Sequence, residues 1–577
     1  MKRPAPMPVV ALIGLSLTLA ACSQMALPHT NQKSEVVSPD AADTGAYLVG
    51  FTENLSAQSL STQVLEAQAI SAAGGVLKSQ FADIHAAAAT LSPQALAKLK
   101  ANPLVAYVEP DLKRHALGFR SGQSVHQAPA LAAQTLTSQA LYAPSGEYTW
   151  GDAALKVADL RASNYTGAGV AVCIGDTGID GNHPEFQRKL KGFKNFTPDV
   201  GRNDPYSLND VSHHGTHVSG TIFAQYGAGT GASGRQPGED VNGVGGVASG
   251  VNLYMARVLG DDGSGSSSGI INGVNWCVSQ LKSQGGTESK VVISLSLGGG
   301  RASQTEQRAY TAAYNKGALI VAASGNDGAT TVSYPAAYAN VLAVGAVDDS
   351  NVKASFSNAG TALDIVGPGV GVLSSVPLGQ GAAASASAVN VPAFTSVTGA
   401  DLSAKATVSA AIVAAGGTNN EFCGAGIGNA ALSGKIALIS RGTCTFEEKV
   451  ANAARSGAAG VMIYNNAAGP LGMSLTNTYA IPVVGLIQTD GQAVLSKLPT
   501  TGTVSVSTAD YEYFDGTSMA TPHVSAAAAV VWAARPTLTN TQLVNLLTST
   551  ATDLGAAGRD NNYGYGLVNP RKAITGN

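Results

Sequence analysis

The chain has 577 residues, a formal net charge of −3 and only 12% charged residues. This length allows three or four domains. The charge balance argues against a nucleic-acid-binding protein, because neither a polybasic surface nor an acidic tail is present.

The first residues are typical of an export signal at 1–22. Lys2 and Arg3 precede an apolar run at 9–21, which is too short for a comfortable membrane span. Cys22 follows Leu-Ala-Ala and resembles the lipidated cysteine of a bacterial lipoprotein, although a plain signal with cleavage after a small residue fits equally well. We therefore expect a protein that is secreted, or anchored to the bacterial cell envelope through Cys22. A polar linker follows at 23–44.

Export places the remaining cysteines in an oxidising setting, where disulfides persist. Cys423 and Cys444 lie close in sequence and are the favoured pair. Cys173 and Cys277 lie in apolar runs, so they either pair with each other or remain as buried thiols.

A compact N-terminal domain is predicted at 45–115. Its pattern of apolar and polar residues gives the order β-α-β-α-β, which predicts a small α/β domain. The expected strands are 46–51, 81–91 and 104–111, and the expected helices are 60–74 and 92–102. Residues 116–147 are rich in Ala, Gln, Ser and Gly and are expected to be an exposed linker open to proteolysis.

A large domain is predicted at 148–378 and 509–577. Short, almost wholly apolar strands alternate with helical patterns, which indicates a mostly parallel sheet covered by helices on both faces. The expected strands are 170–176, 253–259, 291–297, 318–324 and 341–347, and the later helices are 517–535 and 540–550.

A second set of alternating elements predicts an inserted domain at 380–508. It begins with a low-complexity stretch at 379–392. Strands are expected at 435–442, 460–466 and 481–487, with a helix at 447–457 between the first two.

Four segments carry residues suited to chemistry. DTGIDGNHPEF at 176–186 places Asp176 at the carboxyl end of an apolar strand, where ligands collect in open parallel sheets. HHGTHVSGTI at 213–222 leads into a helix. SLGGG at 296–300 is considered together with AASGNDG at 322–328, and DGTSMATPHV at 515–524 places Ser518 at a helix start.

Each segment also has a simpler interpretation. A DTG motif occurs in aspartic proteases, but these need a second carboxylate, and no second DTG exists here. His213, His214 and His217 could form a zinc site, yet HHGTH lacks the glutamate of HExxH. Ser518 could be a helix cap, and Asn326 a turn residue.

Taken together, the four segments resemble the subtilisin-like serine proteases (subtilases) in content and in the order Asp, His, Ser. GTSMATPHV at 516–524 and HGTHVSG at 214–220 are the most specific matches, and the resemblance spans about 148–378 and 509–574. It implies a serine endopeptidase. Ser518 would be the nucleophile, His214 the general base and Asp176 its orienting partner, while Asn326 and the Ser518 backbone N–H would form the oxyanion hole. His217 would be structural and His213 a surface residue.

The resemblance also implies binding residues. SLGG and ASG match the edges of the substrate cleft, and Ser333 matches the base of the primary pocket. The substrate-binding residues would be Ser296, Leu297, Gly298, Ala323, Ser324, Gly325 and Ser333. A structural Ca²⁺ would be held by Glu185, Asp240 and Asn242, which supply oxygen ligands of the right type; a solvated polar loop is the alternative. The chemistry itself needs no cofactor.

The flanking domains resemble known modules as well. Residues 45–115 are similar to a subtilisin-type propeptide inhibitor, which implies a self-inhibited precursor that is cut within 112–147. Residues 433–466 resemble a protease-associated domain, a β-rich module that implies selection of substrates or partners and would be closed by Cys423–Cys444.

The expected partners are protein or peptide substrates and the chain's own propeptide, and a monomer is the expected state. The rival hypotheses are a catalytically inactive binding protein and a lipid-anchored envelope component with a structural role.

Overall fold

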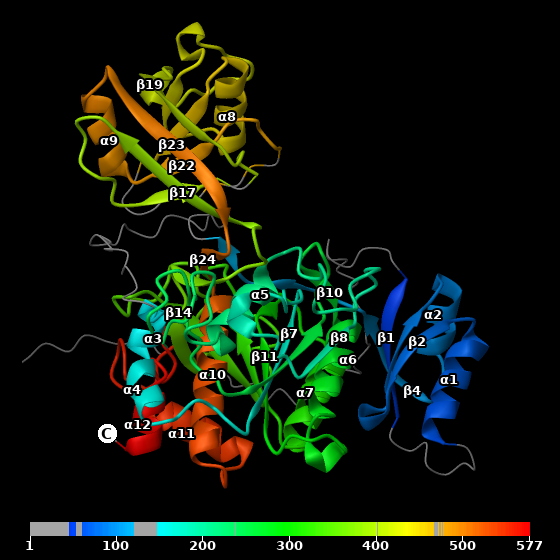
Figure 1. The fold of residues 1–577 in the computed structure, drawn as a ribbon. Coiled ribbons are helices and arrows are strands. Elements are labelled where there is room, and N and C mark those ends of the chain that lie inside the picture. The colour runs from blue at the N-terminus through cyan, green and yellow to red at the C-terminus, as the bar shows by residue number, and fades with distance from the viewer. Residues whose placement is uncertain are drawn as a thin grey trace, which may run out of the picture. The chain divides into compact units, whose positions relative to one another are not determined.

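The fold is given by a computed structural model (Figure 1). It describes residues 45–52, 61–120, 147–236, 238–400, 402–466, 471, 473, 475 and 477–576. The expected signal with Cys22, the linker at 23–44 and most of the linker at 116–147 lie outside the described residues. Each helix within the described ranges is too short or too polar to serve as a membrane span.

The N-terminal domain is built on a four-stranded antiparallel sheet with the order β2-β3-β1-β4. Its elements are β1 (Ala46–Phe51), α1 (Thr62–Ala73), β2 (Val76–Phe81), β3 (Ala86–Thr90), α2 (Pro93–Lys100) and β4 (Val105–Pro110). Gly74 ends α1 with a φ of 90°, a left-handed conformation that glycine adopts without steric cost. The hydroxyl of Ser92 accepts the N–H of Ala95 and so caps α2.

The expectation of a single strand over 81–91 is wrong. The structure has a hairpin there, in which β2 ends at Phe81 and pairs with β3 from Ala86 onward. A short 3₁₀ turn at Ala82–Ile84 and a left-handed His85 reverse the chain between them. This turn contains neither glycine nor proline, the usual turn signals, and so has no clear signature in the sequence.

The large domain is built on a seven-stranded sheet with the order β15-β14-β13-β11-β7-β9-β8, in which all neighbouring strands are parallel. Its strands are β7 (Ala171–Asp176), β8 (Gly192–Asn195), β9 (Asn252–Arg257), β11 (Val291–Leu295), β13 (Leu319–Ala323), β14 (Val341–Val347) and β15 (Ile365–Pro368). The predicted parallel sheet is therefore confirmed.

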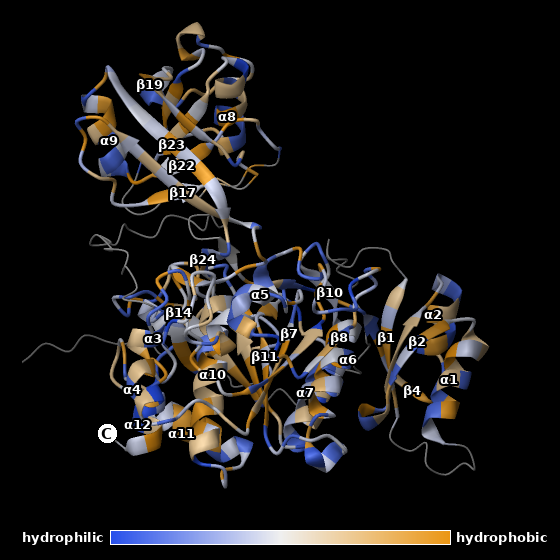
Figure 2. Cartoon of the chain, viewed as in Figure 1, coloured by the Kyte–Doolittle hydropathy of each residue, from blue (hydrophilic) through white to orange (hydrophobic). Residues whose placement is uncertain are grey.

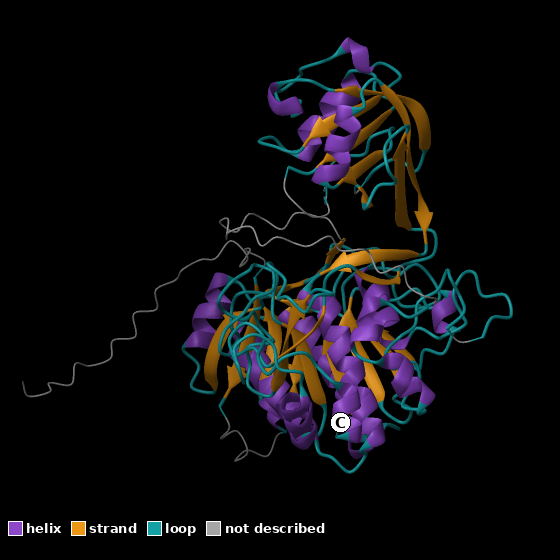
Figure 3. Cartoon of the chain, turned by 90° about the vertical axis from the view of Figure 1, so that its left-hand side faces the viewer, coloured by secondary structure: helices purple, strands orange, loops and turns teal. Residues whose placement is uncertain are grey.

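Helices cover both faces of this sheet (Figures 1 and 3). They are α3 (Trp150–Ala154), α4 (Val157–Ala162), α5 (His214–Phe223), α6 (Ser267–Val278), α7 (Gln304–Asn315), α10 (Thr517–Ala534), α11 (Asn540–Thr550) and α12 (Pro570–Thr575). Alternate residues of β7 pack in opposite directions: Val172 joins the core that contains α10, and Cys173 the core that contains α6. Burial on both sides explains why these strands are almost wholly apolar (Figure 2).

Two small sheets bring distant segments together at the carboxyl ends of these strands. In the first, β5 (Lys113–Ala116) lies between β10 (Ser264–Ser266) and β12 (Leu297–Gly298). In the second, β24 (Tyr511–Asp515) lies between β16 (Val372–Ser375) and β6 (Phe119–Arg120). The segment that follows the N-terminal domain therefore forms part of both sheets.

The inserted domain has its own seven-stranded mixed sheet with the order β17-β23-β19-β20-β21-β22-β18. Its elements are β17 (Gly381–Ala388), β18 (Val397–Gly399), β19 (Thr407–Ala414), β20 (Ile436–Ser440), α8 (Phe446–Arg455), β21 (Gly460–Tyr464), β22 (Val483–Leu486), α9 (Gln488–Ser496) and β23 (Thr500–Ala509). The stretch at 379–392 is more than low-complexity sequence, because GAAASASA at 381–388 forms β17 with alternating exposure and pairs with β23 along its whole length. Alternation of small residues was the available signal for this strand.

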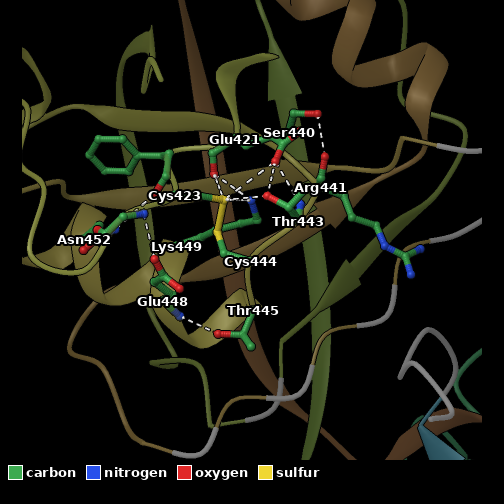
Figure 4. Close-up of a disulfide and its surroundings, with 12 residues drawn as sticks. Glu421, Cys423, Ser440, Arg441, Thr443, Cys444, Thr445, Glu448, Lys449 and Asn452 are labelled. Atoms are coloured by element: carbon green, nitrogen blue, oxygen red, sulfur yellow. Dashed lines mark hydrogen bonds between the residues drawn. A yellow bond between two sulfur atoms is a disulfide. The ribbon is translucent and has the colours of Figure 1, made fainter. Parts of the chain in front are cut away.

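Both cysteine pairs form disulfides, Cys423–Cys444 in the inserted domain and Cys173–Cys277 between β7 and α6. Figure 4 shows the first of these beside Lys449, whose buried ammonium donates to the carbonyl of Glu421 at 2.6 Å. Cys423–Cys444 thus joins the loop before β20 to the start of α8.

Candidate active site

Asp176 and His214 form a buried hydrogen-bonded pair. Asp176 is the last residue of β7, and His214 is the first residue of α5. The Nδ1–H of His214 donates to Oδ1 of Asp176 at 2.7 Å, and the same oxygen accepts the N–H of Thr177. An Nδ1–H tautomer leaves Nε2 of His214 as the atom able to take a proton.

Ser518 is the second residue of α10, where the helix dipole and free N–H groups favour negative charge. Its hydroxyl donates to the carbonyl of Ser296 at 2.8 Å. Nε2 of His214 is buried and has no hydrogen-bond partner among the described residues. A Cβ on Gly118 would lie 2.7 Å from Nε2, so the backbone at Gly118 covers the imidazole. The structure therefore joins His214 to Asp176 and leaves Ser518 hydrogen-bonded elsewhere.

Asn326 and Ser518 both donate to one carbonyl, that of Leu117. The Nδ2 of Asn326 lies 2.5 Å from this oxygen, and the N–H of Ser518 lies 3.2 Å from it. The Oδ1 of Asn326 accepts both the N–H and the hydroxyl of Thr517, which fixes the direction in which the amide points. Such a pair of preorganised donors suits the oxygen of a tetrahedral intermediate.

The chain crosses this site as an extended strand. Before Leu117, β5 pairs with β10 and β12, and the N–H of Leu117 donates to the carbonyl of Ser296 at 3.2 Å. After Gly118, β6 pairs with β24, the strand that precedes Ser518. The peptide bond between Leu117 and Gly118 therefore lies directly at the two donors, with paired backbone on both sides.

Among the predicted substrate-binding residues, Gly298 lies next to the Leu117 side chain, and Ser333 lies next to Gly298. A Cβ on Gly298 would lie 2.7 Å from Cδ1 of Leu117 and 3.5 Å from Cβ of Ser333. The N–H of Ser333 donates to the carbonyl of Ser324 at 2.8 Å. Ser296 and Leu297 belong to the same edge as Gly298, and Ala323 and Gly325 flank Ser324 at the end of β13. The missing Cβ at Gly298 therefore leaves space for the Leu117 side chain, whereas a Cβ on Gly325 would meet Asn358 and Ser333.

The three clustered histidines face different partners. Nε2 of His217 lies 3.0 Å from the carbonyl of Val372 and 3.1 Å from that of Glu512, and burial lowers the pKa of His217 to about 3, so this ring is neutral. The expectation that His213 is a surface residue is wrong: it is 8% exposed, and its Nδ1 lies 3.6 Å from a carboxylate oxygen of Glu512. His214 faces Asp176, so the three rings do not share a ligand.

Glu185 and Asp240 are buried carboxylates that each retain one oxygen without a hydrogen-bond partner, Oε2 and Oδ2 respectively. Both face Gly243, where a Cβ would lie 3.2 Å from Oε1 of Glu185 and 3.3 Å from the Asp240 side chain. Burial raises the pKa of Glu185 to about 8, with smaller contributions from the charges of Glu147 and Asp240. Buried carboxylate oxygens without a hydrogen-bond partner are hard donors of the type that calcium binds.

Asn242 and Arg235 lie next to the Asp240 carboxylate. Asn242 is exposed, and its N–H donates to Oδ1 of Asp240 at 2.9 Å. Nε of Arg235 lies 3.9 Å from the same oxygen and is a competing cation. In the part of the chain that the structure describes, no three His, Cys, Asp or Glu side chains converge as a metal-binding group, so a cation here would need the Asn242 amide or backbone carbonyls as further ligands.

Comparison with known proteins places these features in a family. The Subtilase family model matches residues 167–411 and 485–566, the PA domain model matches 408–494, and the Peptidase inhibitor I9 model matches 46–117. Fold and site therefore define a serine-type endopeptidase with a propeptide inhibitor domain. The chain belongs to the subtilase family.

Individual relatives agree with this assignment. Subtilisin E of Bacillus subtilis is 35% identical over 63% of this chain and 82% of its own length. Subtilisin BL of Lederbergia lenta is 41% identical over 40% of this chain and 74% of its own length. Among solved structures, the psychrophilic subtilisin-like protease Apa1 of Pseudoalteromonas sp. AS-11 matches 74% of this chain and 97% of its own with a TM-score of 0.53 and 30% identity.

Sequence reasoning missed several residues that the structure places at the site. Leu117 and Gly118 lie at the donors, Asn358 donates to the hydroxyl of Ser333 at 3.2 Å, and Glu147 lies near Glu185. The sequence carries no local signal for the first two, because LKRHAL at 112–117 has three polar residues in a row and does not alternate. The partners of Asn358 and Glu147 are far away in sequence, and no local pattern indicates them.

Proposed function

We propose that this endopeptidase cleaves peptide bonds through an acyl-enzyme on Ser518. Ser518 first exchanges its hydrogen bond to Ser296 for one to Nε2 of His214. The Oγ of Ser518 then attacks the carbonyl carbon of the substrate while the hydroxyl proton passes to His214. The carbonyl oxygen becomes negatively charged and receives hydrogen bonds from Asn326 and the Ser518 N–H. When this tetrahedral intermediate breaks down, the C–N bond breaks, and His214 gives the proton to the leaving amine. Water then hydrolyses the ester by the same route, with Asp176 holding the imidazole throughout.

The first substrate is the chain's own Leu117–Gly118 bond. The single observation that carries this proposal is the Leu117 carbonyl, which accepts hydrogen bonds from both Asn326 and Ser518. The bond falls within the range 112–147 expected for the activation cut. After cleavage, residues 113–117 remain as a product strand between β10 and β12 and block the site until the N-terminal domain leaves.

The N-terminus of the active form tests the reaction and the cut together. The full-length wild-type chain, expressed in a bacterial host, should yield a mature form that begins at Gly118, and a serine-reactive phosphonate should label Ser518 in it. Intact-mass analysis and peptide mapping provide the readout. An unlabelled Ser518 in a folded, casein-inactive protein would favour the rival binding function instead.

Intact-mass measurement also tests where the protein is located in the cell. We propose export, because the apolar run at 9–21 matches a signal peptide, with Cys22 as a lipid attachment point or as part of the removed leader. A precursor with two acyl chains and a glyceryl group on Cys22 in the membrane fraction would identify the anchored form. A precursor without that added mass in the medium would identify plain secretion.

The inserted domain is proposed to select substrates or partners, by analogy with the PA domain that it matches. Backbone continuity supports an effect on the site: β16 and β24 pair with each other, and the chain continues from them into β17 and β23, which pair again. Deletion of residues 380–508 should therefore change the ranking of protein substrates.

We also propose that Glu185, Asp240 and Asn242 hold a structural calcium ion. The ion would neutralise the buried carboxylates and so stabilise the fold, without a part in the bond-breaking step.

Removal of calcium should lower thermal stability. An ion at a hundred times its Kd adds about 2.7 kcal/mol to the free energy of unfolding, which corresponds to about 4 °C in Tm for a domain of about 300 residues, the size of the large domain. Differential scanning calorimetry of the Ser518→Ala variant, which cannot digest itself, with and without EGTA, measures this shift. Asp240→Asn should reduce the shift, and an equal response to magnesium would contradict a specific calcium site.

A further inference from the structure

One side chain of the segment that crosses the site is wholly buried and charged. Lys113 and His115 of β5 are exposed, while Arg114 is only 1% exposed. Successive side chains of a strand point to opposite faces, so Arg114 and Ala116 point into the protein. Arg114 is the fourth residue before the Leu117–Gly118 bond.

Arg114 is held by a two-point ion pair with Glu306. Nε of Arg114 donates to Oε1 of Glu306 at 3.0 Å, and Nη2 donates to Oε2 at 2.5 Å. Nη2 also donates to the carbonyl of Arg301 at 2.8 Å. Glu306 is 0% exposed, so water does not screen the pair. This planar, two-point geometry suits a guanidinium better than an ammonium.

The large domain supplies neutral hydrogen-bond donors to the Glu306 carboxylate. Glu306 lies in the first turn of α7, where its N–H donates to the Ser303 hydroxyl. The hydroxyl of Ser267, at the start of α6, donates to Oε1, and the hydroxyl of Tyr338 donates to Oε2 at 2.9 Å. These donors are all neutral, and the cation that pairs with the carboxylate comes from Arg114.

Departure of the N-terminal domain removes this cation. Among the described residues, Arg114 is the ion-pair partner that the structure gives to Glu306. Its loss leaves the carboxylate without this partner, whereas a new guanidinium at the same place restores the pair. A substrate that binds as β5 does, as a strand between β10 and β12, would place its own arginine next to Glu306.

We propose that Glu306 is a specificity-determining residue that selects arginine at the fourth position before the scissile bond. This inference rests on the proposed function and adds a substrate class to it: polypeptides with the pattern Arg-x-x-Leu, in which an apolar residue precedes the cut. Arg114 is the first occupant of the subsite, and it also docks the chain's own Leu117–Gly118 bond for cleavage.

Four peptide p-nitroanilides test the proposal on the wild-type mature enzyme. They carry the sequence of residues 114–117, Arg-His-Ala-Leu, with the arginine kept or replaced by lysine, citrulline or alanine. We expect kcat/KM for the arginine peptide to exceed that for the citrulline and alanine peptides by at least about 30-fold, the lower range for truncation of a buried ion pair. The lysine peptide should have an intermediate kcat/KM. The citrulline peptide tests the charge alone, because citrulline has nearly the shape of arginine but is neutral.

Glu306→Gln should bring the four peptides to within about 3-fold of one another, mainly by a loss on the arginine peptide. Glu288→Gln is the matched control, because Glu288 is also buried, accepts a tyrosine hydroxyl (Tyr254, 2.7 Å) and lies near the amino-terminal end of β11, away from the site. It should keep the wild-type ranking.

The outcomes are distinct for the two proposals. Equal rates on all four peptides with wild-type enzyme, or an unchanged preference in Glu306→Gln, would overturn the subsite while catalysis stands. No hydrolysis of any peptide, with Ser518 unlabelled by phosphonate, would overturn the proposed function itself. The wild-type comparison needs no variant to fold and therefore remains decisive by itself.

Discussion

Ser518→Ala should leave the full-length chain uncut between Leu117 and Gly118 and lower kcat on peptide substrates by about 10⁶-fold, a magnitude taken from subtilisin itself. The hydroxyl oxygen is the atom that forms the bond to carbon, and alanine offers no replacement. The fold should persist, because the hydroxyl makes one hydrogen bond, to Ser296. Gel analysis of the precursor and single-turnover assays provide the readout.

Ser525→Ala is the control for that experiment. Ser525 lies on the same helix, is equally buried and donates to the hydroxyl of Ser294 at 2.9 Å, away from His214. It should be processed and active. A cooperative thermal unfolding transition of the Ser518→Ala precursor, followed by circular dichroism, shows that the variant is folded. Self-cleavage of Ser518→Ala would contradict the proposed nucleophile.

Asp176→Asn should lower kcat by about 10⁴-fold with little change in KM. The carboxylate accepts the Nδ1–H of His214 and so keeps Nε2 free to accept a proton. An asparagine can present its NH₂ to Nδ1 instead, which places the ring proton on Nε2 and removes the base. Steady-state kinetics on a leucine p-nitroanilide peptide measure this loss.

Asp152→Asn is the control for Asp176→Asn. Burial raises the pKa of Asp152 to about 7, so this buried acid loses little charge when it becomes an amide. Its Oδ2 accepts both the N–H and the hydroxyl of Thr149 at the start of α3, and kcat should stay near the wild-type value. A comparable loss in both variants would indicate general misfolding and no special role for Asp176.

The fold of the large domain could be predicted from the sequence because its physics is local. Strands buried on both faces must be apolar along their whole length, as in VVISL at 291–295. The ends of those strands then place Asp176 close to the start of α5. The hairpin at 76–90 and the strand at 381–388 were missed because the turn of the first contains neither glycine nor proline and the second is built mainly from Ala and Ser.

The sequence does not indicate that the chain's own residues 114–118 occupy the active site. Arg114 and Glu306 are 192 residues apart. Each would ordinarily be read as a solvated charge, and only the folded chain shows both buried. The donors on Leu117 come from Asn326 and Ser518, which belong to different elements, so no spacing in the sequence points to the bond between 117 and 118.

The strand that crosses the site also has a consequence for where the active enzyme ends up. Scission after Leu117 separates Cys22 covalently from every residue of the large domain. A lipid on Cys22 would then tether the hydrolase only through non-covalent docking, including the contact between Arg114 and Glu306. Loss of that docking would unblock the cleft and free the enzyme from the membrane in one step, so activity would first emerge away from the cell surface.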